Sequence, residues 1–151
     1  MSQLLRLYID ADVLFRAATR SRQQTAAYIV LKLADLTLLE VITARHAFHE
    51  ALRNLHSHSA AGAAELLDLA GHSLQIISDP TASMLVSVQD QANPKDVINL
   101  AAAQEGGAPL LITFNTRNYF VRTAPVRIMA PGQFIEAMRV FMAEAWRNLP
   151  E

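Results

Sequence analysis

The sequence predicts a three-layer α/β/α domain with a central, mostly parallel sheet of four to five strands. Short apolar runs of strand length alternate with longer segments whose apolar residues recur at helical spacing. One of the short runs, residues 110–113, carries no charge, as is typical of a strand covered on both faces. Strands that alternate with helices favour a parallel sheet, because each helix provides the crossover between two parallel strands.

The first half of the chain contains three of the predicted strands. Asp10 ends the first of them, and Asp79-Pro80 ends the third. The strands are predicted over residues 4–9, 39–42 and 74–77. A helix follows the first strand, and a second is predicted over residues 25–39. A third begins after Thr43 as its N-cap and runs through Leu55, and a fourth covers residues 60–70.

The second half continues the alternation. Asn93-Pro94 is expected to open a helix, because proline suits the first helical turn, and Gly106-Gly107 is expected to end it. The strands are predicted over residues 110–113 and 126–129. The helices are predicted over residues 81–89, from Asn93-Pro94 to Glu105, and over residues 131–146.

Length and composition exclude several classes of protein. The 151 residues (16.6 kDa) fit a single domain over residues 1–151, and 52% hydrophobic with 18% charged residues exclude intrinsic disorder. The absence of cysteine excludes disulfide scaffolds, thiolate metal sites and cysteine nucleophiles. Neither a membrane-spanning run nor a secretory signal is recognisable, so we expect a cytoplasmic protein with no membrane association.

Polar residues follow the first and fourth predicted strands. Asp10 and Asp12 come directly after the first strand, and Asn115 lies two residues beyond Thr113. Ligands of open parallel sheets bind beyond the carboxyl ends of the strands, so these side chains converge if the two strands are neighbours. Glu50, in the helix after the second strand, and Asp96, at the start of an apolar helix, are further candidates.

Each acid also has an ordinary structural interpretation. Asp12 is interpreted first as the N-cap of the helix after the first strand, Glu50 as a solvated helix residue, and Asp96 as a partner of its helix dipole. Together, however, these interpretations leave Asp10 and Asp96 beside apolar segments without compensation. Crowded carboxylates usually require a divalent cation, and oxygen ligands select Mg²⁺ or Mn²⁺.

Histidines offer a competing site. His46 and His49 lie three residues apart on one helix face, beside Glu50, but the HExxH order and a clear third ligand are absent. We interpret them as surface residues, with His49 as the one that lines the acidic site. Serine-hydrolase and nucleotide-binding motifs are also absent.

Three segments of the chain resemble the PIN-domain nucleases, and most closely the VapC-like toxin ribonucleases and related bacterial PIN proteins. The segments are YIDADVLFRA, HEALRNL and NPKDVINLAAAQEGGAPLLITFNTRNY. The resemblance covers residues 5 to about 136. It implies a metal-dependent endonuclease that cleaves single-stranded RNA, often as the toxin of a toxin–antitoxin pair. It also implies a homodimer and an antitoxin partner.

The resemblance assigns a role to each candidate residue. Asp10, Glu50 and Asp96 would bind Mg²⁺ or Mn²⁺, and Asn115 would be a further catalytic residue. Asp12 and Thr113 would hold these residues in position without binding the metal themselves. Arginines near the expected rim would hold RNA phosphates, although solvated surface residues explain them equally well. These arginines are Arg16, Arg20, Arg22 and Arg117.

The sequence departs from the family pattern at Asn115 and Asn118, where aspartate is frequent. Asparagine offers a neutral oxygen, so metal affinity should fall and two-metal chemistry is less secure. A catalytically weak PIN module that binds RNA or a protein partner is therefore the alternative. An unrelated receiver-like phosphotransfer domain ranks last, because neither Lys32 nor Lys95 lies at the end of a late strand.

Overall fold

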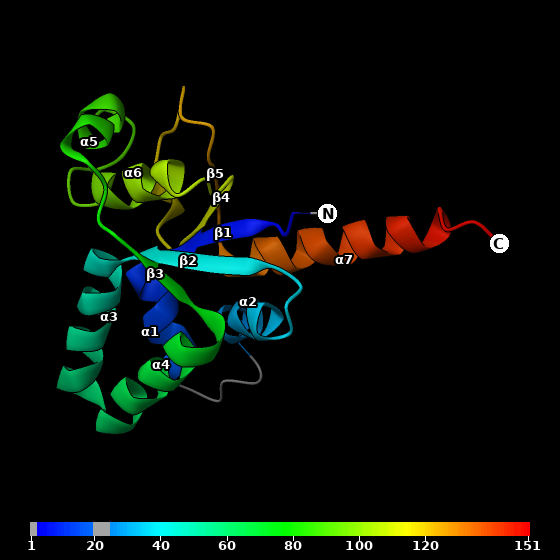
Figure 1. Ribbon diagram of the computed structural model, residues 1–151, viewed down its shortest axis with the longest axis horizontal. Coiled ribbons are helices and arrows are strands. Elements are labelled where there is room, and N and C mark those ends of the chain that lie inside the picture. The colour runs from blue at the N-terminus through cyan, green and yellow to red at the C-terminus, as the bar shows by residue number, and fades with distance from the viewer. Residues whose placement is uncertain (1–2, 20–24) are drawn as a thin grey trace.

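The computed structural model describes residues 3–19 and 25–151 (Figure 1). Within these residues, five strands form one sheet in the order β3-β2-β1-β4-β5, and every neighbouring pair is parallel. The strands are β1 (Arg6–Ile9), β2 (Glu40–Ala44), β3 (Gln75–Ile77), β4 (Leu110–Ile112) and β5 (Arg127–Met129). The predicted three-layer α/β/α class is therefore confirmed.

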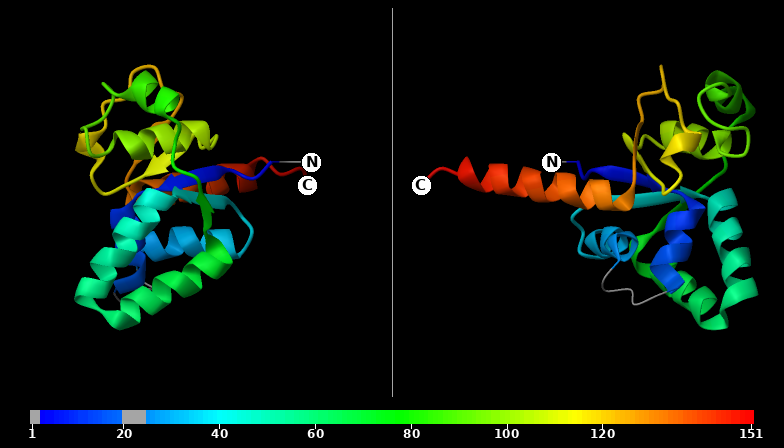
Figure 2. Two further views of the ribbon diagram at one scale, coloured as in Figure 1. Left: turned by 60° about the vertical axis from the view of Figure 1, so that its left-hand side comes forward. Right: turned by 180° about the vertical axis from the view of Figure 1, so that it is seen from behind.

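Helices cover both faces of the sheet (Figures 1 and 2). One face carries α1 (Ala11–Thr19), α2 (Ala26–Asp35), α3 (Arg45–His58), α4 (Ala60–Ser73) and the first part of α7 (Pro131–Arg147). The other face carries α5 (Ala82–Val88) and α6 (Val97–Glu105). The far part of α7 extends beyond the sheet, as Figure 1 shows.

The side chains of β1 divide between the two cores. Leu7 and Ile9 belong to the core under α1–α4, whereas Tyr8 belongs to the core under α5 and α6. This division follows from the strand period of two, which sends successive side chains to opposite faces. All three are fully buried, so β1 is covered on both sides, as expected for the central strand of a parallel sheet.

The strand order fixes where a site can form. The chain passes from β1 outward to β2 and β3, and then crosses to β4 on the other side of β1. The Asp10 amide donates to the Ile112 carbonyl at 3.0 Å, so the ends of β1 and β4 lie against each other. This is the switch point at which open α/β sheets bind ligands.

Two predicted helix starts are wrong. Thr43 is not an N-cap: it lies in β2, its hydroxyl donates to the Ile9 carbonyl at 2.7 Å, and Ala44 is the residue that precedes α3. The strand continues past Ile42 because this buried hydroxyl is satisfied across the sheet rather than by a helix end. Asp96 is not inside its helix but precedes it as the N-cap residue, and its side chain makes no capping bond.

The helix predicted over residues 25–39 ends at Asp35. Thr37 has a φ of 60°, and its amide and that of Leu38 donate to the Ala34 and Leu33 carbonyls, which closes the helix. Among the residues that the structure describes, no helix is long and apolar enough to cross a membrane.

Candidate metal centre and active site

The predicted acids gather around one cavity of about 160 Å³ at the carboxyl ends of β1 and β4. Its lining residues come from four separate segments of the chain: Asp10, Ala11, Asp12, His46, Glu50, Lys95, Asp96 and Asn115. The structure therefore brings together Asp10, Glu50, Asp96 and Asn115, which the sequence suggested separately. Their roles in binding or catalysis remain proposals.

Asp10 is buried and accepts hydrogen bonds on both oxygens. Oδ1 accepts from the Ala11 amide (2.7 Å) and from Asn99 Nδ2 (3.2 Å). Oδ2 accepts from the hydroxyls of Thr113 (2.9 Å) and Tyr119 (3.3 Å). Four donors use the acceptor capacity of this carboxylate, so Asp10 is held rigidly at the floor of the site.

Asp12 connects α1 to the segment after β4. Its Oδ2 accepts from the Phe114 amide (3.1 Å) and from Asn115 Nδ2 (3.0 Å). The N-cap interpretation of Asp12 is wrong, because α1 begins at Ala11 and Asp12 lies inside its first turn. Asn115 acts here as a donor to Asp12.

Two carboxylate oxygens around the cavity have no partner. Asp12 Oδ1 and Asp96 Oδ2 are buried, and neither accepts a hydrogen bond from the described residues. Asp96 is only 8% exposed. An unsatisfied buried carboxylate oxygen is costly, so these two atoms are the places where a cation would be most favoured.

Glu50 and His46 come from successive turns of α3. Glu50 is half-buried, and its carboxylate has no hydrogen-bond or ion-pair partner within residues 3–19 and 25–151. His46, four residues earlier, lines the cavity, whereas the expected His49 does not. The four-residue spacing places His46 and Glu50 on one helix face, and this was the signal that could have identified His46.

The residues present fit a hard divalent cation. The donors are carboxylate and amide oxygens, which Mg²⁺ and Mn²⁺ prefer, and two of them are buried without partners. In the described part of the chain, no three His, Asp or Glu side chains are close enough to form a finished metal site. The cavity therefore supplies oxygen ligands around one recess, but not a preformed metal site.

Burial and mutual repulsion shift the titration of two of these acids. Burial raises the pKa of Asp10, and the neighbouring Asp96 carboxylate adds to the effect, while hydrogen bonds from Thr113 and Ala11 oppose it. Burial, together with the charge of Asp10, raises the pKa of Asp12 from 3.8 to about 7. A cation in the cavity would favour the charged forms of both groups.

Residues behind the acids were not identified from the sequence. The Tyr8 hydroxyl donates to Asn99 Oδ1 at 2.8 Å, and Asn99 in turn holds Asp10. Tyr119 reaches Asp10 from the segment after β4. Asn99 lies three residues after Asp96 in the apolar first part of α6, and this buried polar residue was the available signal. Thr113, by contrast, was expected behind the site, and its hydroxyl does donate to Asp10.

Of the four arginines expected near the rim, two can be placed. Arg16 lines a groove next to the acidic cavity, and Arg117 lies exposed in a short 3-10 helix over Thr116–Asn118. Arg20 and Arg22 lie outside the described residues. Neither Arg16 nor Arg117 contacts one of the carboxylates, so both are open to an external anion.

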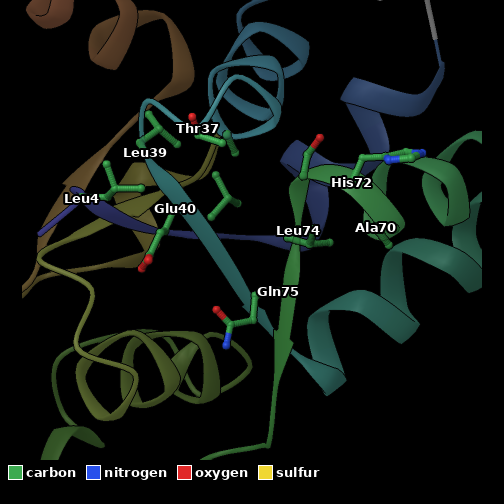
Figure 3. Close-up of a pocket in the computed structure, with 12 residues that line it drawn as sticks. Leu4, Thr37, Leu39, Glu40, Ala70, His72, Leu74 and Gln75 are labelled. Atoms are coloured by element: carbon green, nitrogen blue, oxygen red, sulfur yellow. The ribbon is translucent and has the colours of Figure 1, made fainter.

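A second cavity of about 300 Å³ lies at the opposite end of the sheet (Figure 3). Thr37 and Leu39 lie on one side of it, and His72 lies on the other. Glu40 is the acid that lines it, and this carboxylate already pairs with Arg6 at 2.9 Å. The cavity lies at the amino ends of β2 and β3, away from the switch point, and offers no cluster of free acids.

The fold is that of a PIN domain, which the chain shares with solved structures of PIN proteins. PAE2754 from Pyrobaculum aerophilum has a TM-score of 0.61 at 15% identity, over 90% of this chain and 96% of its own. VapBC2 from Rickettsia felis, bound to a DNA fragment from its promoter, has a TM-score of 0.60 at 14% identity, over 83% and 98%.

A further structure, the sarcin-ricin loop cleaving toxin VapC20 of Mycobacterium tuberculosis, is less similar. Its TM-score is 0.48 at 13% identity, over 70% of this chain and 86% of its own. No protein-family model matches the sequence, and no curated protein matches it as a sequence relative.

Proposed function

We propose that this chain is a metal-dependent endoribonuclease that cleaves phosphodiester bonds of single-stranded RNA. The observation that carries the proposal is the cavity at the switch point, which four carboxylates line and in which two buried oxygens lack partners. The PIN fold shared with VapBC2 supports the choice of reaction, and so does the resemblance of the sequence motifs to VapC-like toxins.

We propose Asp10, Glu50 and Asp96 as metal ligands and add Asp12, because its Oδ1 is buried without a partner. A bound Mg²⁺ or Mn²⁺ supplies a Lewis acid that activates water and stabilises charge on the phosphodiester. Asp10 accepts four hydrogen bonds, so it orients the site, and it binds an ion directly only if its longest bond, from Tyr119, gives way.

The other residues of the cavity act on position and charge. Asn115 and the Phe114 amide fix Asp12, so we propose that Asn115 contributes to catalysis by holding this carboxylate. Thr113 bonds to both Asp10 and the Asn115 amide, which ties the end of β4 to the end of β1. Lys95 lines the cavity as its cationic member and can attract a phosphate to an otherwise acidic recess.

The test is cleavage of a 5′-labelled single-stranded RNA by the purified protein. We expect Mn²⁺ or Mg²⁺ to support cleavage, EDTA to stop it, and Asp96→Asn and Asp10→Asn each to reduce it by a hundredfold or more (roughly the 3–4 kcal/mol typical of lost transition-state electrostatics). Asp68→Asn, an exposed acid on α4, is the matched control and should cleave normally.

Thermal unfolding separates lost chemistry from lost folding. Burial and repulsion by Asp96 disfavour the charge of Asp10, so the metal-free Asp10→Asn variant should melt at the wild-type temperature or higher, and Asp96→Asn should keep one cooperative unfolding transition. RNA cleavage that survives in both variants, or that continues in EDTA, would contradict the proposed site.

A second function follows from Asn115. Asparagine is neutral, so it offers no negative charge where PIN nucleases frequently carry an acid, and its Nδ2 donates to Asp12 instead. A catalytically weak module that binds RNA or a protein partner is the resulting alternative. Calorimetric titration with Mn²⁺ distinguishes the two: binding at or below millimolar metal supports the nuclease, and its absence supports the weak module.

The toxin role and its partners belong to the same proposal. VapBC2 is a complex that was crystallised on promoter DNA, which supports an antitoxin partner for this chain. We also propose a homodimer, as the VapC-like resemblance implies, and a cytoplasmic location. Growth arrest on expression of the wild type, absent for Asp96→Asn, would support the toxin role.

A further inference from the structure

The acidic cavity opens into a larger groove of about 600 Å³. The two share Ala11, Asp12, Glu50 and Asn115, so the groove begins where the proposed cleavage site ends. The other lining residues of the groove are aromatic, basic or amide side chains, and none is acidic: Phe15, Arg16, Asn54, His58 and Phe114. Its size is in the range of pockets that hold small organic groups.

Phe114 has an exposed aromatic ring on a backbone that is hydrogen-bonded to the acidic site. It is 46% exposed, although its amide donates to Asp12 and its neighbour Thr113 donates to Asp10. Single exposed hydrophobic residues are common on proteins and need no explanation. Phe114 differs because its backbone is tied to the acids and its ring lines a groove that runs from them.

Arg16 lies over this ring in a cation–π contact. Its guanidinium carbon is 5.7 Å from the Phe114 ring centroid, and it makes no ion pair with a described acid. It is the permanently charged cation among the described residues of the groove. An aromatic ring next to an unpaired arginine is the combination with which proteins bind single-stranded nucleic acid, through base stacking and phosphate contact.

We propose that this groove binds the nucleotide next to the scissile phosphate, with its base stacked on Phe114 and its phosphate held by Arg16. The inference rests on the proposed function, because the acidic cavity defines which phosphate is cleaved. The acids beside Phe114 repel a phosphate, so a strand that crosses the cavity needs a compensating cation, and Arg16 lies where the groove continues. Phe114 is therefore a specificity-determining residue that favours an unpaired base at this position.

Binding of RNA that carries one abasic nucleotide tests the stacking. We would measure the anisotropy of labelled single-stranded RNA in EDTA with the full chain carrying Asp96→Asn, which we expect to slow cleavage at least a hundredfold. An abasic nucleotide at one position should weaken binding by about tenfold or more when Phe114 is present. With Phe114→Ala, intact RNA should bind about as weakly as the abasic RNA, and the abasic penalty should disappear.

Matched variants identify the cause of any loss. Phe120→Ala removes a ring that is 43% exposed but lies outside the groove, and it should bind intact RNA normally. Phe114→Trp should retain the abasic penalty. Arg16→Gln should weaken the binding of intact and abasic RNA equally. It should also reduce the salt dependence of binding by the amount expected for about one lost phosphate contact, whereas Arg139→Gln on α7 should change neither property.

The outcomes separate this inference from the proposed function. If the wild type cleaves RNA and Phe114→Ala binds intact and abasic RNA as the parent does, the groove proposal is overturned and the nuclease remains. If the wild type leaves RNA uncut in Mn²⁺, the nuclease proposal fails, and the abasic comparison still decides the groove. Unchanged RNA binding by Phe114→Ala overturns the groove proposal even if that variant loses a protein partner.

Discussion

At the scale of single residues, the site separates two kinds of buried acid. Asp10 is buried with its hydrogen bonds satisfied, whereas Asp12 and Asp96 each keep one buried oxygen without a partner. A buried carboxylate whose oxygens all accept hydrogen bonds stabilises one arrangement of the surrounding polar groups. A buried carboxylate oxygen without a hydrogen-bond partner instead favours the binding of a cation. Asp12 and Asp96 therefore differ from Asp10 in having a buried oxygen that could still accept a proton, a water or a cation.

Asp12 makes the metal-free protein sensitive to pH. The pKa of this carboxyl rises from 3.8 to about 7 on folding, so the folded state binds the proton more tightly than the unfolded chain does. Its contribution to stability is present below about pH 4 and is lost as pH rises through about 7. Asp10 shifts in the same direction.

We therefore expect the melting temperature in EDTA to fall between pH 5 and pH 8, and to fall less for Asp12→Asn. Asp90→Asn, an exposed acid, should follow the wild type. Mn²⁺ should restore stability at pH 8, by about 2.7 kcal/mol at a hundredfold excess over its dissociation constant. Identical pH slopes for Asp12→Asn and the wild type would contradict the assignment.

At the scale of elements, the end of α2 carries local strain. Thr37 adopts a φ of 60° in the turn that closes this helix, where the Leu38 amide donates to the Leu33 carbonyl at 3.0 Å. Glycine usually occupies this position, because a branched side chain in the left-handed region costs about 1–2 kcal/mol. The turn is retained because it directs the chain from α2 into β2.

Thr37→Gly should therefore stabilise the protein by about 1 kcal/mol in urea unfolding. The matched control is Ala64→Gly, at an exposed position inside α4, which should destabilise by a similar amount because its backbone is ordinary helix. Loss of stability in Thr37→Gly would show that the threonine side chain contributes a contact that outweighs the strain.

At the scale of the whole molecule, the packed layers and the end of α7 differ. Phe134, near the start of α7, is buried in the core under α1–α4, but every residue from 143 to 151 is exposed. Figures 1 and 2 show this end of the helix extending away from the sheet. The last turns therefore contribute little to the stability of a single copy.

Deletion of residues 143–151 should shift the melting temperature by less than about 2 °C and leave one cooperative transition, as the single-domain interpretation requires. Phe134→Ala should instead cost about 3–5 kcal/mol, because it empties part of the core. A larger drop in melting temperature on deletion would mean that another molecule covers the end of α7 in solution. If that molecule is a second copy of the chain, the melting temperature of the wild type should rise with protein concentration.

The alternation of apolar runs predicted the layers because burial on both faces selects uninterrupted apolar strands. It located all the strands to within a few residues, including the uncharged β4. Local signals were less reliable at helix ends: Thr43 carries a capping side chain, yet the hydroxyl bonds to Ile9 across the sheet. Capping preferences describe isolated helix ends, and a tertiary partner for the same hydroxyl outweighs them.

By itself, the sequence predicted the α/β class and the acids that line the cavity, because both depend on which residue types occur in which order. The tertiary structure decided that β4 lies beside β1, since strand order depends on packing between distant segments. That adjacency places Thr113 on Asp10 and Asn115 on Asp12. The tertiary structure also decided which carboxylate oxygens accept hydrogen bonds and which do not. The donors come from other segments of the chain and reach the carboxylates only after the sheet has assembled.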